Sequence, residues 1–269
     1  MDTKFKLNDS LPPLRKYAFI GNRNHFLNKL KYLSVLAENE NWHYDSGQMN
    51  LTEEEKNYGV LFQYIHHTFA KALEEESIIE TETHSIMNTG LLTENGEEIY
   101  MLFEINQVEN AQKWYLTGFF KASNHHIPQN MRDKLPEFTD YFDNQSDMMY
   151  FDLNLEIYPN YDHIINDHLD RLPADIRALD IDIIRTILSS AHTNMKKRIL
   201  RNRQLVVPQY YNKKIMYLVP LKIGKTDVPA AIEKHENSYR MNTIFTKDMA
   251  YCNARLLMKP ESNWLINSK

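Results

Sequence analysis

The sequence predicts an α+β protein whose antiparallel sheets, built from two meander-like sets of strands, are packed by long amphipathic helices. Three observations predict this class. Apolar residues recur at helical spacing in several segments, a strand-type pattern with an Asn-Gly turn follows residue 78, and a second group of short apolar runs follows residue 203. No internal repeat or Gly/Ser linker separates the two sets of strands. We therefore expect a lead-in and helix over residues 1–35 and a single domain over residues 36–269, with a split near residue 150 as the alternative.

The first part of the chain is predicted to be helical. Residues 24–38 carry apolar side chains at helical spacing. Thr52 and Glu55 match a capping box, and the apolar stripe that follows it predicts a helix ending near Leu73.

Strands are predicted from residue 84 onward. Residues 84–93, 97–106 and 113–120 read as a meander, with a hairpin turn at Asn95-Gly96. Residues 148–157 are compatible with a further strand. A short helix over residues 161–173 is predicted to stop at Pro173.

The longest helix is predicted to begin near Ala174. Its apolar face continues to Ile199, and its last turns carry a basic cluster: Lys196, Lys197, Arg198, Arg201 and Arg203. The second set of strands is predicted over residues 204–208, 214–223, 229–235 and 239–246. A final helix is predicted over residues 247–257, with Thr246 at its N-cap.

Composition excludes several classes of protein. The chain has only 7 Gly and lacks the GxGxxG, GxxxxGK[ST] and GxSxG patterns, which argues against dinucleotide-fold oxidoreductases, P-loop enzymes and elbow-type serine hydrolases. The single cysteine, Cys252, excludes an intrachain disulfide and any multi-cysteine metal site. We expect a soluble cytoplasmic protein with no membrane contact, because no signal region and no apolar run of spanning length occur.

A catalytic group is predicted on the short helix. His163, Asp167 and Arg171 follow one another at four-residue spacing, so all three can lie along one helix face. His163 would then act as general acid or base oriented by Asp167, while Arg171 would hold an anionic oxygen. A surface helix with a routine Asp-Arg pair is the alternative.

A ligand-binding wall is predicted at the end of the chain. The final helix carries Asp248, Asn253 and Arg255 among small residues, and Arg240 and Thr243 precede it on a strand. A structural ion pair between Asp248 and Arg255 is the alternative reading. Cys252 has no evident base beside it, so we expect a small buried side chain rather than a nucleophile.

Two further polar groups interrupt predicted strands. Asn88 and Thr89, before Gly90, predict either a ligand-binding site or a bulge that satisfies its own backbone. Tyr210, close to the basic cluster, is compatible with stacking on a base or with a hairpin corner.

A dedicated metal site is not expected. His163 and His168 are five residues apart, and side chains at that spacing on a helix point in different directions. Mg²⁺ bound through substrate phosphates is the more plausible metal.

The sequence resembles the domain-of-unknown-function 3825 family from about Leu36 to Leu265. The resemblance rests on "LAENENW", "NTGLLTENGEEIYMLFEIN", "HIINDHLDRLP", "VPQYY", "LVPLKI" and "YRMNTIFTKDMAYCNARLLMKPESNWL". This chain departs from the family pattern at Met87 and Cys252, where the family has Phe and Asn. The resemblance implies a shared polar pocket, because its motif positions include Asn88, Thr89, His163, Arg171, Gln209, Tyr210, Thr243, Asp248, Tyr251, Asn253 and Arg255. Relatives joined to RNA-binding modules such as cold-shock domains imply work on RNA or nucleotides.

These observations predict a nucleotide- or RNA-handling domain whose partner is a nucleotide or single-stranded RNA. If the domain is an enzyme, we expect a hydrolase that acts on phosphoesters. The basic cluster, Arg171 and Arg255 would contact phosphate oxygens. A non-catalytic nucleotide sensor and a protein-interaction adaptor are the alternatives. The sequence indicates no particular oligomeric state.

Overall fold

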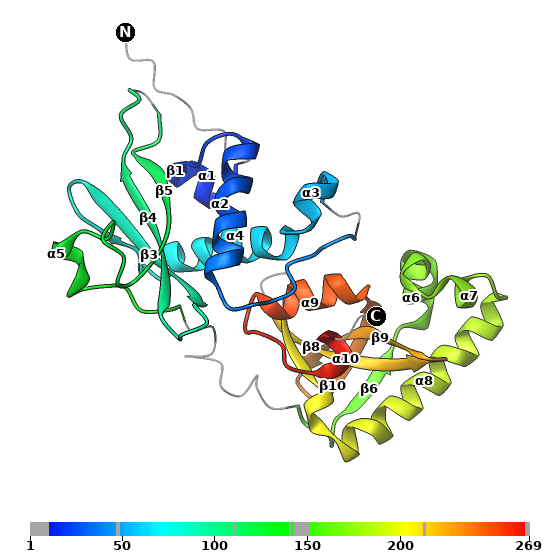
Figure 1. Cartoon of the computed structure of the whole chain (residues 1–269). Coiled ribbons are helices and arrows are strands. Elements are labelled where there is room, and N and C mark those ends of the chain that lie inside the picture. Colours follow the sequence, from blue (N-terminus) through cyan, green and yellow to red (C-terminus); the bar gives the residue numbers. More distant parts are fainter. Residues whose placement is uncertain are drawn as a thin grey trace, which may run out of the picture. The chain divides into compact units, whose positions relative to one another are not determined.

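The computed structural model describes residues 11–46, 49–109, 111–139, 141, 151–211 and 214–266. The chain divides into two compact units (Figure 1). Unit 1 comprises Met1–Asp45 and Met49–Asp140, and unit 2 comprises Ser46–Gln48 and Tyr141–Lys269. The α+β class with mostly antiparallel sheets is confirmed, since each unit contains one five-stranded sheet. The single domain over residues 36–269 remains a prediction.

Unit 1 is built on a sheet of order β1-β5-β4-β3-β2. Its strands are β1 (Ala18–Phe19), β2 (Ile79–Glu80), β3 (His84–Leu92), β4 (Glu98–Ile105) and β5 (Trp114–Lys121). All neighbours are antiparallel except β1 and β5. The predicted meander and its turn are confirmed, with Gly96 at a positive φ of 75° as the turn requires.

Helices cover both faces of this sheet. They are α1 (Pro13–Tyr17), α2 (Arg23–Leu36), α3 (Glu53–Lys56), α4 (Gly59–Glu74) and α5 (Gln129–Arg132). Phe69 of α4 meets Phe103 of β4, whereas Met131 of α5 packs in a cluster with Leu102. Because neighbouring residues on a strand point to opposite faces, α4 and α5 lie on opposite sides of the sheet.

The predicted helix from Thr52 to Leu73 is interrupted. The capping box is confirmed, but it starts only the short helix α3, and α4 begins separately at Gly59. The break lies at Asn57 and Tyr58, where Tyr58 leaves helical geometry with φ −128° and ψ 13°.

Unit 2 is built on a sheet of order β6-β10-β9-β8-β7. Its strands are β6 (Glu156–Pro159), β7 (Val207–Tyr211), β8 (Lys214–Ile223), β9 (Thr226–His235) and β10 (Ser238–Ile244). β6 runs parallel to β10, and the other neighbours are antiparallel. Of the further strand predicted over residues 148–157, residues 148–150 lie outside the described residues, and β6 begins only at Glu156.

Helices lie on both faces of the unit 2 sheet. They are α6 (Tyr161–His168), α7 (Ala174–Arg177), α8 (Ile181–Arg201), α9 (Lys247–Arg255) and α10 (Asn263–Ile266), with short 3₁₀ turns η2 (Leu169–Arg171) and η3 (Arg203–Leu205). The apolar face of α8 forms one core with Tyr217 and the other side chains on that side of β8. Asn253 of α9 bonds to Gln209, which pairs with Met216 of β8. Met216 is the neighbour of Tyr217 along β8, so Gln209 and Met216 point to the other face of the sheet from Tyr217. Thus α9 lies on the face opposite α8 (Figure 1).

The prediction that the longest helix begins near Ala174 is wrong. α7 ends at Arg177, and α8 starts at Ile181 after a turn in which the Asp180 carboxylate accepts the backbone N–H of Asp182 at 3.0 Å. One helix therefore ends and the next is capped here, and Leu179, which lies between the two helices, is 40% exposed.

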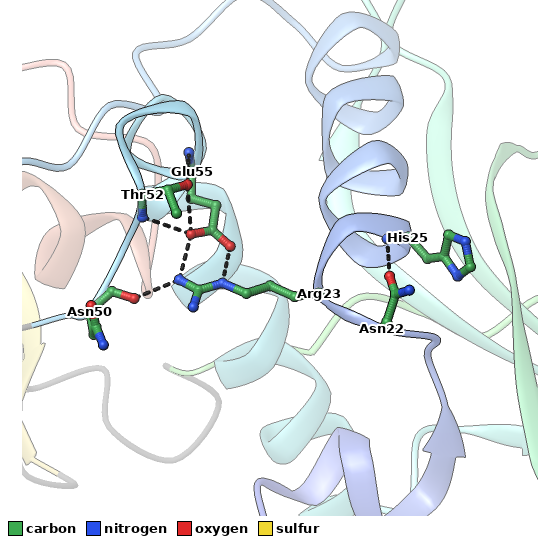
Figure 2. Close-up of polar contacts among 6 residues, drawn as sticks. All are labelled: Asn22, Arg23, His25, Asn50, Thr52 and Glu55. Carbon is green, nitrogen blue, oxygen red and sulfur yellow. Dashed lines mark hydrogen bonds and ion pairs between the residues drawn. The ribbon is translucent and has the colours of Figure 1, made fainter.

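An ion pair fixes the start of α3 to α2 in unit 1. Arg23 donates from Nε and Nη2 to the two carboxylate oxygens of Glu55, which also accepts the backbone N–H of Thr52 at 2.8 Å and its hydroxyl at 2.9 Å (Figure 2). Glu55 is buried, so its charge depends on these donors. The Arg23 guanidinium is the main reason that the pKa of Glu55 is lowered from 4.5 to about 2.

We expect this carboxylate to make stability depend on pH below about 4.5. The unfolded chain takes up the proton first, so the stabilisation by Glu55 is complete above its ordinary pKa and is lost as the pH falls toward about 2. Urea unfolding of the wild type and of Glu55→Gln at pH 7, 4 and 3 measures it. The difference in unfolding free energy should shrink as the pH falls, and a difference independent of pH would contradict this role for the charge.

Candidate functional site

A cavity of about 270 Å³ in unit 2 brings together four of the predicted site residues. His163 and Arg171 come from α6 and η2, while Arg240 and Thr243 come from β10. The remaining lining residues are His168, Tyr211, Met216, Ala231, Glu233 and Asn242. The cavity lies on the face of the sheet opposite α8, because Met216 and Ala231 alternate with core residues of β8 and β9.

The His163 side chain is oriented by its own helix. Asn160 caps α6 by accepting the backbone N–H of His163 at 3.2 Å, and Asp167, one turn later, meets His163 Nδ1 at 2.5 Å. This contact confirms the prediction, made from their four-residue spacing, that His163 and Asp167 lie side by side on the helix. A carboxylate at Nδ1 favours the tautomer that is protonated there, so Nε2 can accept or deliver a proton.

Arg171 is fixed to β10 rather than to a carboxylate. Its Nη1 donates to the hydroxyl of Thr243 at 3.1 Å and to the carbonyl of Ile244 at 2.9 Å, and its guanidinium lies 5.7 Å from the ring centroid of Phe245. Both hydrogen bonds use Nη1, so within the described residues Nη2 and Nε are not engaged. The guanidinium is therefore held in place with donors left for an anion.

A β-bulge supplies the opposite wall. The pairing of β10 with β9 shifts register between Met241 and Thr243, so Asn242 is an extra residue. Met241 and Ile244 both remain in the core shared with α8. The bulge thereby directs two successive polar residues, Asn242 and Thr243, toward the cavity.

Positive charge in the cavity exceeds what the neighbouring carboxylates neutralise. Neither Arg171 nor Arg240 has a carboxylate partner among the described residues. Of the nearby acids, Asp167 pairs with His163, and Glu233 pairs with Lys214 at 2.6 Å although it lies opposite Arg240 in register. Two guanidiniums are thus available to one anionic group.

His168 also lines the cavity, although its position in the sequence did not predict it there. The prediction that its ring diverges from that of His163 is wrong, because the ring centroids are 5.0 Å apart. The reason is that His168 ends α6 with φ −135° and ψ 20°, outside helical geometry, as the chain turns into η2. A helix-stop signal at Pro173 was visible, but not the backbone conformation at His168.

His168 is held neutral by its surroundings. Burial, then the positive charge of Arg171 and the neighbouring His163, lower the pKa of His168. Its Nδ1 is buried and makes no side-chain hydrogen bond within the described part of the chain, and the backbone of Asp167 partly opposes the lowering of the pKa. His168 therefore contributes a neutral ring, and no charge, to the cavity wall.

Other predicted residues of unit 2 lie outside this cavity. At the start of α9, Asp248 accepts the backbone N–H of Ser46 at 2.6 Å and the hydroxyls of Ser46 and Thr246 at 2.7 and 2.5 Å. Thr246 occupies the predicted N-cap position, but its side chain makes no capping hydrogen bond. Asp248 therefore ties Ser46 to the helix start.

The far end of α9 is packed against the edge strand β7. The amide of Asn253 donates to Gln209 at 3.3 Å, Gln209 is fully buried, and Arg255 is 6% exposed. Tyr210 packs edge-on against Tyr141 at 5.8 Å, so its ring is engaged by the protein.

Cys252 is buried in the same helix. Burial, and then Asp248, raise the pKa of Cys252 to about 12. The group is therefore a thiol at neutral pH, which is consistent with a packing role.

Asn88 and Thr89 belong to unit 1, where they form a bulge. The pairing of β3 with β4 shifts register between Asn88 and Leu91. Asn88 bonds to Glu98, the Pro136 carbonyl and the Gly90 N–H, and the Thr89 hydroxyl donates to the Ile99 carbonyl at 2.6 Å. These side chains satisfy the local backbone, as the bulge alternative predicted.

The basic cluster is divided between paired and unpaired cations. Lys196 pairs with Glu156 at 2.5 Å, and Arg198 pairs with Asp227 at 2.7 Å. Lys197, Arg201 and Arg203 are exposed and have no carboxylate partner among the described residues. These three cations carry charge that no described carboxylate neutralises, and a nucleic-acid role for the cluster stays a prediction.

No group of three or more metal-ligating side chains is found among the described residues. Within the same residues, no helix is both long and apolar enough to cross a membrane.

A comparison with curated proteins gives no match, and neither does a comparison with solved structures. A family model described as Domain of unknown function (DUF3825) matches residues 33–264, which confirms the resemblance inferred from the sequence. The chain therefore belongs to the DUF3825 family.

Proposed function

We propose that the unit 2 cavity binds the phosphate group of a nucleotide or of single-stranded RNA and that His163 acts on the phosphoester bond. One observation carries the proposal: Arg171 and Arg240, two guanidiniums without a carboxylate partner among the described residues, line the same cavity as His163, which is paired with Asp167. Guanidiniums bind phosphate through paired N–H donors, and a phosphoester is a substrate on which an oriented imidazole can act.

The chemistry we propose is hydrolysis. The Nε2 of His163 takes a proton from the attacking water as the new P–O bond forms, and the same proton then passes to the leaving oxygen as the ester P–O bond breaks. Arg171 and Arg240 balance the charge that develops on the phosphoryl oxygens. Mg²⁺ would enter through the phosphate groups of the substrate.

Base recognition would fall to Tyr211. Tyr211 lines the cavity and is 38% exposed, whereas Tyr210 packs against Tyr141. The ring of Tyr211 is supported by Phe245 at 5.5 Å. An exposed aromatic ring beside cationic groups suits stacking on a nucleobase.

A non-catalytic nucleotide sensor is the second candidate. It is favoured by the exposure of the pair, since the side chains of His163 and Asp167 are 43% and 55% exposed. Water weakens the electrostatic interaction within such an exposed pair. In an enzyme, the bound substrate would need to exclude this water. In either version we place the protein in the cytoplasm, with the phosphate-bearing ligand as its partner.

Replacing a cavity guanidinium should weaken phosphate binding. We expect Arg171→Gln and Arg240→Gln each to raise the Kd of a nucleoside monophosphate by roughly 10- to 100-fold, from the typical worth of hydrogen bonds to charged groups. Isothermal titration at low salt measures it. Arg177→Gln on α7 removes an equal charge outside the cavity and should change nothing. If no nucleotide or short RNA binds the wild type, the proposal is wrong.

Replacing His163 separates the enzyme from the sensor. In the enzyme, His163→Ala should lower turnover of the nucleotide that binds by roughly 10²–10⁴-fold while its Kd changes little. Asp167→Asn should give a smaller loss, because the imidazole remains but its tautomer is less firmly held. Phosphate release is the measurement. Binding without detectable turnover in the wild type would leave the sensor version only.

A further inference from the structure

A second cavity lies in unit 1 and has a different chemistry. Its volume is about 380 Å³, within the range of small-molecule sites. Most of its wall is apolar, with side chains from α2, from α4 and from the segment between them: Phe26, Leu27, Leu30, Met49, Leu51, Tyr58 and Phe62. Its polar lining is Arg15, Arg23, Asn50 and Glu55. None of its described lining residues belongs to the unit 2 site.

Aromatic rings form part of the apolar wall. Phe26 and Phe62 meet edge-on at 5.9 Å, and both contact the ring of His66 at 5.6 and 4.5 Å. Burial, and then the charge of Arg15, lower the pKa of His66 to about 4. His66 is therefore uncharged at neutral pH and supports the two phenyl rings as a flat, neutral ring.

Glu55, the one acid among the described residues that line this cavity, is already neutralised. Both oxygens of Glu55 accept hydrogen bonds from Arg23, and Thr52 adds two more donors (Figure 2). Arg23 also donates to the Asn50 carbonyl at 2.6 Å. The pair contributes no net charge, and Glu55 has little capacity left to attract a cation.

Arg15 is the charge that remains. Among the described residues its side chain makes no hydrogen bond and has no carboxylate partner. The cavity therefore combines one unneutralised guanidinium, that of Arg15, with a mostly apolar wall. This combination favours a ligand that has an anionic group and an apolar remainder. The planar fork of a single guanidinium matches a carboxylate through paired hydrogen bonds.

We propose that this cavity binds a small aromatic carboxylate, with its carboxylate on Arg15 and its ring against Phe26 and Phe62. The site is independent of the proposed phosphate site. The volume accommodates one ring with a short chain, and the aromatic wall offers the edge-to-face and offset contacts that ring systems prefer.

Titration with 3-phenylpropionate tests the site, and the neutral 3-phenylpropanamide serves as the matched ligand. We expect the acid to bind the full-length protein with a Kd in the millimolar range or tighter, and the amide to bind at least roughly 10-fold more weakly, because the amide cannot form a charged pair with Arg15. Ligand-observed NMR measures both. Failure of the acid to bind, or equal binding of acid and amide, would overturn the proposal.

Three variants then locate the ligand. Arg15→Gln should weaken binding of the acid at least roughly 10-fold, whereas Lys31→Gln, which removes an equal charge from α2 outside the cavity, should not. Leu51→Trp fills the cavity from a segment outside the helices, so it should also reduce binding even if Arg15→Gln proves unstable. Unchanged affinity in Arg15→Gln and Leu51→Trp would place the acid elsewhere and refute the site. Nucleotide binding should be the same in all three variants, which separates this test from that of unit 2.

Discussion

The alternation of side chains along β10 is the constraint on which the unit 2 site depends. Tyr239, Met241 and Ile244 all point into the core shared with α8, although a strict two-residue period would turn Ile244 to the other face. The bulge at Asn242 absorbs the difference. The same extra residue positions Thr243 to receive Arg171, so core packing and the position of a cavity guanidinium depend on one irregularity.

Polar residues in this chain differ in whether the protein itself satisfies them. Asn88, Thr89 and Asp248 form hydrogen bonds with nearby backbone groups and side chains of the protein, and these bonds stabilise the local structure. Arg171 and Arg240 keep donors that no described residue uses. This difference, rather than the kind of residue, separates structural polar groups from candidate ligand-binding ones.

Local patterns in the sequence predicted much of the secondary structure. Contacts between residues far apart in the sequence could not be predicted from such patterns. The capping box at Thr52, the turn at Gly96 and the His163–Asp167 pair each involve residues within one turn or hairpin, so spacing alone decides them. The break before α8 was missed because apolar spacing continued across Asp180. The cavity could be predicted only in part: the contact of Arg171 with Thr243 joins positions 72 residues apart, and the approach of His168 to His163 depends on a backbone angle at a helix end.

The link between Ser46 and Asp248 has a consequence for how the protein can be divided. Unit 2 is not a continuous stretch of chain, since residues 46–48 belong to it while the residues on either side belong to unit 1. A fragment cut at residue 141 would lack Ser46 and would leave the Asp248 carboxylate, at the half-buried start of α9, without two of its donors. The limits of unit 2 therefore do not coincide with a single cut in the polypeptide. A shortened gene would have to encode residues 46–48 as well as the C-terminal segment to produce the whole unit.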